Sequence, residues 1–360
     1  MKQQMIINGR FLKRPITGVE RYGREMLRIW DRLALAGEAP IVKIYVPCGT
    51  PDDLNFSVLK IEVIGTHQGH FWEQFDLARA TRGHTLISLA NSGPIFHQHH
   101  LVVLHDAAPF RFPNAYALHY RLWHRFLGRA LSRTARLATV SMFSQGELAY
   151  VLKLAETAIA VVPSGGDHLG QIMPDSRIIA RLALVPCRYF LAVGSANPNK
   201  NTSLLFDTWQ RCAAKIPSGV KLVVVGDVTG RAFRAFLPVP GENVNLVLPG
   251  RVSDAELAAL YQSAAAFIFP SFYEGFGIPP LEAMSYGIPV LAADIAPLRE
   301  TCGNAALYFS PHEESELSRL MERVFAPQFD RQAQIENGRA QLQKFKWQAS
   351  VERLLAAASF

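Results

Sequence analysis

Short apolar runs recur along the chain, and most of them are followed by a turn and a stretch of helical periodicity. This alternation predicts parallel β-sheets joined by crossover helices, which is an α/β architecture. The segment Pro163-Ser164-Gly165-Gly166-Asp167 interrupts the pattern and predicts a linker. The first series of runs comprises 5–8, 41–46, 58–64, 85–89, 101–105, 137–140 and 158–162, and the second comprises 189–193, 221–225, 244–248, 265–269, 289–292 and 306–309.

The chain has 360 residues, which is too long for one ordinary core and suits two α/β domains. We expect an N-terminal domain over 1–167 and a C-terminal domain over 168–344, followed by an amphipathic helix at about 345–360. Each domain is expected to be doubly wound. Because ligands of such sheets bind beyond the carboxyl ends of the strands, we expect the site in a cleft where the two domains face each other.

Hydrophobic residues make up 49% of the chain, enough for two cores. The first residues lack the apolar stretch of a signal peptide, and no apolar run approaches the ~20 residues that span a bilayer. We therefore expect a cytoplasmic protein. The four cysteines lie far apart, which predicts small buried hydrophobes rather than zinc ligands or disulfides. They are Cys48, Cys187, Cys212 and Cys302.

The formal net charge is +7, and most of the excess lies in the first half of the chain, which predicts an anionic partner there. Arg121, Arg125, Arg129 and Arg133 recur at four-residue spacing, so a helix would hold them within an arc of ~120°. One interpretation is a solvated face whose long side chains cover apolar surface. The other is a patch that binds an anionic membrane leaflet. No nucleic-acid-binding motif accompanies these arginines, so we expect no nucleic-acid partner.

The most informative segment runs from residue 269 to 293, from the end of one predicted strand to the next. A helix is expected to begin near Pro279, where proline's missing N–H costs nothing. The preceding turn would then direct backbone amides at a ligand from a helix N-terminus, which attracts phosphate. Its two glycines would let a ligand approach the main chain closely. The residues expected to present these amides are Gly275, Phe276, Gly277 and Ile278.

Two carboxylates flank this turn, Glu274 in the loop and Glu282 about one turn into the helix. Carboxylates accept hydrogen bonds from vicinal hydroxyls, such as those of ribose or a hexose. The alternative is a helix-capping Glu274 with a surface Glu282. Taken alone, Glu282 favours that alternative, whereas the whole segment favours a nucleotide-sugar site.

The segment Ser-Phe-Tyr-Glu-Gly-Phe-Gly-Ile-Pro-Pro-Leu-Glu-Ala-Met-Ser-Tyr-Gly, with Glu274-x7-Glu282, resembles the signature of glycosyltransferase family 4. These are retaining enzymes of GT-B fold that include mannosyltransferase-like group 1 enzymes, and the resemblance extends over nearly the full chain. It implies two Rossmann-like domains, with the acceptor on the first and the nucleotide sugar on the second. It also implies that Glu274 contacts the donor hexose, that Glu282 holds the ribose, and that the C-terminal helix crosses back to the first domain.

A second match follows the first strand of the second domain, at residues 193–201. It resembles the family's phosphate-binding turn, in which an Arg-Lys pair neutralises the diphosphate. Lys200 matches the lysine, but the arginine position holds Asn199. Loss of one charge-stabilising donor is typically worth ~3 kcal/mol, or roughly a hundredfold in rate. Another cation, such as Arg231, would have to substitute.

In the first domain, Thr17-Gly18-Val19-Glu20 predicts a capping box at the start of a helix. The Gly18 amide belongs either to an ordinary cap or, as the resemblance implies, to a substrate-binding loop. His105 ends a predicted strand and matches the family's histidine that reaches the donor sugar. Ser141 caps a helix or lines the cleft. Arg251 and Val252 match positions that contact the base, mainly through the main chain.

We therefore expect a retaining hexosyltransferase that uses a nucleotide-diphosphate sugar, with GDP-mannose first and a UDP-sugar second. The acceptor would be lipid-linked or a saccharide, in bacterial surface polysaccharide synthesis at the inner membrane face. Lys200, Glu274 and His105 are the expected catalytic residues. Protein groups would neutralise the diphosphate, so no metal or cofactor is expected. Two alternatives stay open: a non-catalytic nucleotide-sugar-binding scaffold, favoured by Asn199, and a GT-B nucleotide-sugar epimerase.

Overall fold

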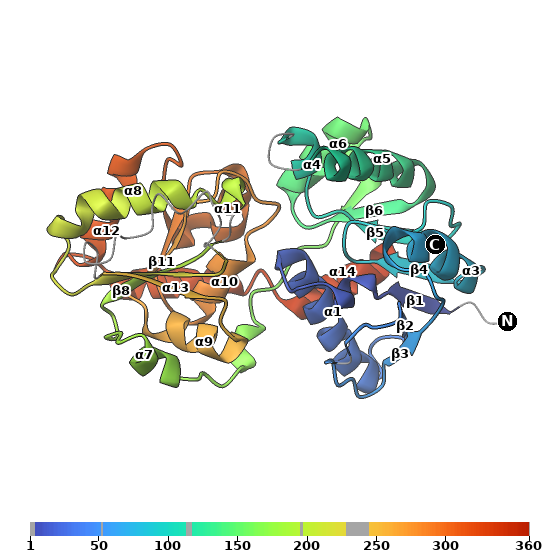
Figure 1. Cartoon of the computed structure of the whole chain (residues 1–360), viewed down its shortest axis with the longest axis horizontal. Coiled ribbons are helices and arrows are strands. Elements are labelled where there is room, and N and C mark those ends of the chain that lie inside the picture. Colours follow the sequence, from blue (N-terminus) through green and yellow to red (C-terminus); the bar gives the residue numbers. More distant parts are fainter. Residues whose placement is uncertain (1–3, 52, 113–116, 195–196, 228–244, 360) are drawn as a thin grey trace. The chain divides into compact units, whose positions relative to one another are not determined.

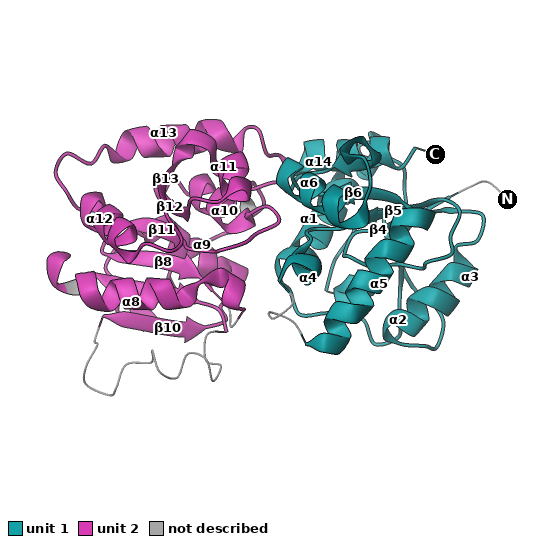
Figure 2. Ribbon diagram, turned by 90° about the horizontal axis from the view of Figure 1, so that it is seen from above, with its two compact units in different colours: residues 1–164, 347–360 teal, residues 165–346 magenta. Residues whose placement is uncertain are grey.

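The structure is a computed structural model that describes residues 4–51, 53–112, 117–194, 197–227 and 245–359. The chain divides into two compact units, which Figure 2 colours teal and magenta. Unit 1 comprises Met1–Ser164 and Trp347–Phe360, and unit 2 comprises Gly165–Lys346. The expected limits at residues 167 and 344 lie close to these.

Unit 1 contains a seven-stranded sheet of order β3-β2-β1-β4-β5-β6-β7 in which every pair is parallel. The order reverses between β1 and β4, so this is a doubly wound sheet with its switch point there. The strands are β1 Met5–Asn8, β2 Lys43–Val46, β3 Lys60–Val63, β4 Thr85–Ser88, β5 His100–Val103, β6 Arg136–Thr139 and β7 Ile159–Val161.

Helices cover both faces of this sheet, with α5 and α6 on one face and α1 and α14 on the other (Figure 1). Strands β4 and β5 are buried at every residue, as expected for parallel strands covered on both faces. The helices are α1 Gly18–Leu35, α2 Gly69–Phe71, α3 Ala78–Ala80, α4 Ala108–Arg111, α5 Leu118–Thr134, α6 Met142–Leu152 and α14 Trp347–Ala357, with 3-10 turns η1 Arg10–Lys13 and η4 Glu156–Ala158 and the π-helical segment η2 Trp72–Leu77.

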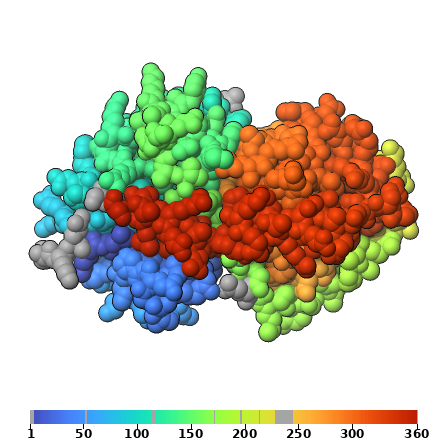
Figure 3. Space-filling view, turned by 180° about the vertical axis from the view of Figure 1, so that it is seen from behind, coloured from blue at the N-terminus to red at the C-terminus, as the bar shows by residue number. Residues whose placement is uncertain are grey.

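The C-terminal helix α14 belongs to unit 1 and packs on α1. Trp347 is fully buried, with its ring centroid 5.7 Å from that of Tyr22 on α1. Arg136 of β6 donates a hydrogen bond to the Ser359 carbonyl. Figure 3 shows this segment in red beside the blue and green segments of unit 1.

Unit 2 contains a six-stranded parallel sheet of order β10-β9-β8-β11-β12-β13, whose switch point lies between β8 and β11. Figure 1 shows α8 and α12 on one face and α7 and α9 on the other. The strands are β8 Tyr189–Val193, β9 Lys221–Val225, β10 Leu246–Gly250, β11 Ala266–Phe269, β12 Val290–Ala293 and β13 Ala306–Phe309. The helices are α7 Arg177–Arg181, α8 Thr202–Cys212, α9 Asp254–Ser263, α10 Ile278–Ser285, α11 Ala296–Cys302, α12 Glu314–Val324 and α13 Arg331–Leu342, with 3-10 turns η5 Leu169–Gln171, η6 Pro198–Lys200, η7 Ala213–Lys215 and η9 Gly303–Ala305.

The doubly wound α/β prediction is thus confirmed, and each predicted apolar run overlaps a strand. The prediction for the cysteines is half wrong: Cys212 and Cys302 are buried, but Cys48 and Cys187 are exposed. Cys187 has φ +58° in a turn before β8, and turns lie at the surface because their backbone groups need water. Among the described residues, no helix combines the length and apolar character needed to cross a bilayer.

Candidate functional site

The two predicted phosphate-binding turns meet at the switch point of the unit 2 sheet. Lys200 ends η6 after β8, and Glu274 lies in the loop after the neighbouring strand β11. The Phe272 amide donates to the Asn199 carbonyl over 2.8 Å, and the Asn201 side chain donates to the Pro270 carbonyl over 3.1 Å. These bonds join the two turns at the sheet edge where doubly wound folds bind ligands.

Lys200 and Glu274 form an ion pair, with 2.7 Å between Nζ and Oε1. The Lys200 ammonium also lies 5.3 Å from the centroid of the Phe269 ring, within cation–π range. The side chains are 29% and 14% exposed, so solvent and ligands reach both. The structure therefore brings together two of the three residues predicted to be catalytic. A bound diphosphate would compete with Glu274 for the ammonium, and sugar hydroxyls would compete for the carboxylate.

The turn before α10 contains three backbone amides for which the described residues provide no acceptor. Phe276, Gly277 and Ile278 are buried, and within the described part of the chain no acceptor takes a hydrogen bond from their N–H groups. Buried amides are nearly always paired, so such a group indicates a ligand site. Helix α10 begins at Ile278, one residue before the expected start, and Pro279 and Pro280 contribute no N–H.

Neighbouring side chains fix the shape of this turn. Gly277 has φ +107°, and a Cβ built there would lie 2.7 Å from Leu298 Cδ2, so only glycine fits without rearrangement. The Phe276 carbonyl accepts a hydrogen bond from the Thr301 hydroxyl over 2.7 Å, and its ring packs against that of Phe345. The amides are thus held in place before any ligand binds.

Glu282 is a buried residue, 6% exposed, so the alternative of a surface glutamate is wrong. One carboxylate oxygen accepts a hydrogen bond from the Tyr261 hydroxyl over 3.0 Å. The other lies 2.9 Å from Nε2 of His168, which is also buried. A buried carboxylate is costly unless it is partnered. Tyr261 and His168 are the partners of this carboxylate, and no sequence pattern predicted either of them.

The other predicted positions in unit 2 lie at the same edge of the sheet. Asn199 is buried and its amide donates to Asn197 Oδ1 over 3.0 Å, so it shapes the turn and supplies no charge. Arg251 is exposed and Val252 half-buried, directly after β10. Arg231, the predicted substitute cation, lies outside the described residues.

In unit 1, His105 follows β5 and is 7% exposed. Its Nε2 lies 2.8 Å from the Leu89 carbonyl, so Nε2 donates and Nδ1 keeps an acceptor lone pair. Burial lowers the pKa of His105 to about 4, so the ring is neutral near pH 7. Gly18 is the exposed first residue of α1, and its predicted capping box is present. The donor contacts implied for His105 and Gly18 stay predictions.

Ser141 was predicted to cap a helix or to contact substrate, and the structure shows the cap. Its hydroxyl accepts a hydrogen bond from the Ser144 amide over 2.9 Å at the start of α6. The residue is fully buried. The serine therefore stabilises the helix end, as side-chain caps do.

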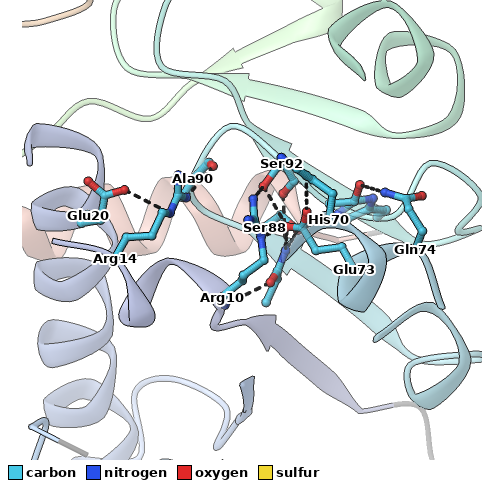
Figure 4. Close-up of polar contacts among 12 residues, drawn as sticks. Arg10, Arg14, Glu20, His70, Glu73, Gln74, Ser88, Ala90 and Ser92 are labelled. Atoms are coloured by element: carbon cyan, nitrogen blue, oxygen red, sulfur yellow. Dashed lines mark hydrogen bonds and ion pairs between the residues drawn. The ribbon is translucent and has the colours of Figure 1, made fainter. Parts of the chain in front are cut away.

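A polar cluster at the switch point of the unit 1 sheet was not predicted (Figure 4). Its centre is Glu73 in η2, a fully buried carboxylate. Glu73 Oε1 accepts from Asn8 Nδ2 over 2.9 Å and from the Ser92 hydroxyl over 2.7 Å, and lies 2.9 Å from Nε of Arg10. Oε2 lies 3.0 Å from His70 Nδ1. Burial opposes ionisation, but these hydrogen bonds and the arginine charge outweigh it and hold the pKa of Glu73 at about 2.

Across the described ranges, no group of three or more His, Cys, Asp and Glu side chains is arranged to hold a metal ion. His97 and His100 are both buried. His100 Nε2 lies 2.9 Å from the Ser88 hydroxyl, so its environment is that of a core histidine.

Comparisons with known proteins agree with this geometry. Residues 184–341 match the family described as glycosyl transferases group 1. The O-antigen chain mannosyltransferase B of Escherichia coli is 25% identical over 94% of this chain and 94% of its own length. The O-antigen chain mannosyltransferase RfbU of Salmonella typhimurium strain LT2 is 28% identical over 66% of this chain and 67% of its own. The solved sucrose-phosphate synthase of Thermosynechococcus elongatus has a TM-score of 0.73 at 20% identity and covers 99% of this chain and 98% of that one.

Two doubly wound units, with an amide-lined turn between acidic residues in the second, define an α/β enzyme of GT-B fold. The family match lies within unit 2, and the Escherichia coli relative aligns over nearly the whole chain. The chain is therefore similar to group 1 glycosyltransferases.

Proposed function

We propose that this enzyme transfers a hexose, with retention, from a nucleotide-diphosphate sugar to a lipid-linked or saccharide acceptor. GDP-mannose is the first donor to test and UDP-sugars the second. The relatives named as O-antigen mannosyltransferases support a mannosyl donor and a role in bacterial surface polysaccharide synthesis. The Glu274-x7-Glu282 spacing supports assignment to glycosyltransferase family 4.

The observation that carries this proposal is the set of backbone amides at the buried residues 276–278, for which the described residues provide no acceptor, beside the Lys200–Glu274 pair. Amides at a helix N-terminus and an ammonium together suit a diphosphate. Glu274 then binds donor hexose hydroxyls, and Glu282 binds the ribose. We assign Lys200 and the start of α10 to neutralising the diphosphate as it leaves, so the transfer needs no metal.

In the proposed reaction, the acceptor hydroxyl attacks the anomeric carbon from the face that the diphosphate leaves. The C–O bond to the diphosphate breaks as the bond to the acceptor oxygen forms, and the hydroxyl proton passes to the departing phosphate oxygen. No carboxylate is assigned as a covalent nucleophile. Lys200 and the turn amides stabilise the charge that develops on the leaving group, which is commonly the largest catalytic contribution.

The second candidate is a nucleotide-sugar-binding scaffold without transferase activity, and Asn199 is the observation that favours it. A neutral side chain stands where the family signature has an arginine, and a missing cation of this kind costs roughly a hundredfold in rate. The intact Lys200, Glu274 and Glu282 favour the enzyme.

We also propose that α5 contacts an anionic membrane surface through Arg121, Arg125, Arg129 and Arg133. A groove of about 500 Å³ runs along this helix, lined by Arg125, Arg129, Arg133, Leu122, Phe126 and Ala130. Leu122 and Phe126 are more than half exposed, so apolar and cationic side chains share one helix face, as in interfacial helices.

A donor screen tests the proposed function. Saturation at a hundred times the Kd stabilises a protein by about 2.7 kcal/mol, which raises the Tm of a domain of this size by roughly 5–10 °C. We expect this shift with one of the UDP-, GDP- or ADP-sugars, and its loss in Glu282→Ala. Glu336→Ala, an exposed glutamate on α13, should keep it.

Activity assays separate the two candidates. We expect turnover with lipid-linked saccharides at a rate that EDTA does not change. A donor whose sugar–phosphate bond is axial should give a product whose glycosidic bond is also axial. Donor stabilisation without turnover on any acceptor would instead support the scaffold. Absence of any nucleotide-dependent shift would refute both.

A further inference from the structure

The two units are built alike around their switch points. In unit 2 the turns after β8 and β11 supply Lys200 and Glu274. In unit 1 the equivalent place lies after β1 and β4, where Arg10 and Ser92 are found. Doubly wound sheets bind ligands at this point, so the unit 1 cluster is a second candidate binding site.

Glu73 makes the base of this cluster rigid. It is fully buried and holds Arg10, which is 12% exposed, while Arg10 Nη2 donates to the Ser92 hydroxyl over 2.7 Å. Glu73 belongs to the π-helical segment η2, and such segments are frequent at functional sites. The Arg10 guanidinium has five N–H donors, so its ion pair with Glu73 and its hydrogen bond to Ser92 leave N–H groups that can donate to a ligand.

The rim of the cluster is aromatic and accessible. Tyr120 of α5 is 42% exposed, and its ring centroid lies 4.1 Å from that of His124. Arg14 is 37% exposed, beside the Ala90 carbonyl in Figure 4. Burial raises the pKa of Tyr120, and Asp106 adds to this while Arg14 opposes it, so these groups lie within electrostatic range of one another.

The charges of the cluster favour an uncharged ligand. Arg10 is paired with Glu73, and Arg14 Nε lies 3.3 Å from Glu20. Since each guanidinium already faces a carboxylate and Asp106 adds a third, little attraction is left for a phosphate. Burial, then the nearby His70 and arginines, lower the pKa of His124 to about 4, so this ring is neutral and can both donate and accept.

We propose that Arg10, Arg14, Tyr120 and His124 form a subsite for an uncharged pyranose of the acceptor, with Glu73 as the positioning residue. The apolar C–H face of the sugar packs on the Tyr120 ring, and the guanidiniums and the imidazole bind its hydroxyls. This rests on the proposed transferase function. It adds the chemistry of the acceptor, a neutral sugar at the reacting end, and the residues that recognise it.

The test measures acceptor KM and donor KM separately in the full-length enzyme, with a mannose-terminated saccharide as acceptor. For Tyr120→Leu we expect acceptor KM to rise about tenfold, with kcat and donor KM within about twofold of wild type. Tyr120→Phe should stay near wild type because it keeps the ring. Tyr150→Leu is the matched control, an exposed tyrosine on α6 of the same unit, and should change nothing.

Two further variants test the positioning role. Glu73→Gln should raise acceptor KM by roughly the same factor, and Arg10→Lys, which keeps the charge but loses the planar fork, should do likewise. If Glu73→Gln fails to fold, Arg10→Lys still decides. Unchanged acceptor KM in both Tyr120→Leu and Arg10→Lys would overturn the subsite. It would also be overturned if saturation-transfer NMR showed that inorganic pyrophosphate displaces the acceptor saccharide and methyl α-mannopyranoside does not.

Failure of the proposed function is distinguishable from failure of the subsite. If wild type shows no donor-induced thermal shift and no slow donor hydrolysis without acceptor, the proposed function itself is wrong. If both are present in wild type and in all variants while acceptor KM never moves, the donor site stands and only the subsite is wrong.

Discussion

Gly277→Ala is expected to destabilise unit 2 and to abolish nucleotide binding. A non-glycine residue at positive φ costs about 1–2 kcal/mol, and the new Cβ would lie 2.7 Å from Leu298 Cδ2. Overpacking of this kind costs a further ~1–3 kcal/mol. The sum, about 2–5 kcal/mol, predicts a Tm lower by roughly 5–15 °C for a domain of this size. Relief of the clash would also move the unpartnered amides of Gly277 and Ile278.

Gly219→Ala is the matched control. Gly219 also has positive φ, +79°, but a Cβ there meets no atom within 4 Å, so only the backbone cost of about 1–2 kcal/mol applies. Thermal unfolding of both variants, with and without the donor nucleotide, separates backbone strain from the clash. Equal stability of the two variants, or normal nucleotide stabilisation of Gly277→Ala, would refute this reasoning.

Three further predictions concern single side chains. Lys200→Met should lower kcat by about a hundredfold with intact folding; a drop below threefold in steady-state assays would exclude a role in leaving-group stabilisation. His105 has a folded pKa of about 4, below its unfolded value, so stability is lost as pH falls from 6.5 towards 4. Between pH 7 and pH 5, the free energy of unfolding measured in urea should fall by about 2 kcal/mol more for wild type than for His105→Asn. Equal decreases in the two proteins would contradict the burial argument. Ser141→Ala should lower the unfolding free energy by about 1 kcal/mol and leave donor KM unchanged. An altered donor KM would instead support the predicted contact between Ser141 and the substrate.

The sheets were predictable because parallel strands covered on both faces are continuous apolar runs. Strand β8 was expected at 189–193 and spans Tyr189–Val193, and β13 was expected at 306–309 and spans Ala306–Phe309. The Thr17–Glu20 capping box is a local pattern and is present. Lys200 and Glu274 could be assigned to one site because each directly follows a strand, and neighbouring parallel strands end at the same edge.

Contacts between distant segments had no local signal. Glu73 meets Asn8, 65 residues away, only because β1 and β4 are neighbours in the sheet and η2 packs over their ends. Its sequence neighbourhood resembles an ordinary helix with one glutamate. The burial of Glu282 was missed for the same reason, since His168 and Tyr261 reach it from separate elements.

The most direct test of the central claim is the chemical shift of two backbone amides. In the full-length protein labelled with ¹⁵N-glycine, titration with GDP or UDP should move the Gly277 and Gly275 amide protons, because a diphosphate oxygen accepts hydrogen bonds from this turn. Saturable movement of these resonances is the predicted result. Nucleotide binding that shifts other glycines and leaves these two unchanged would contradict the account.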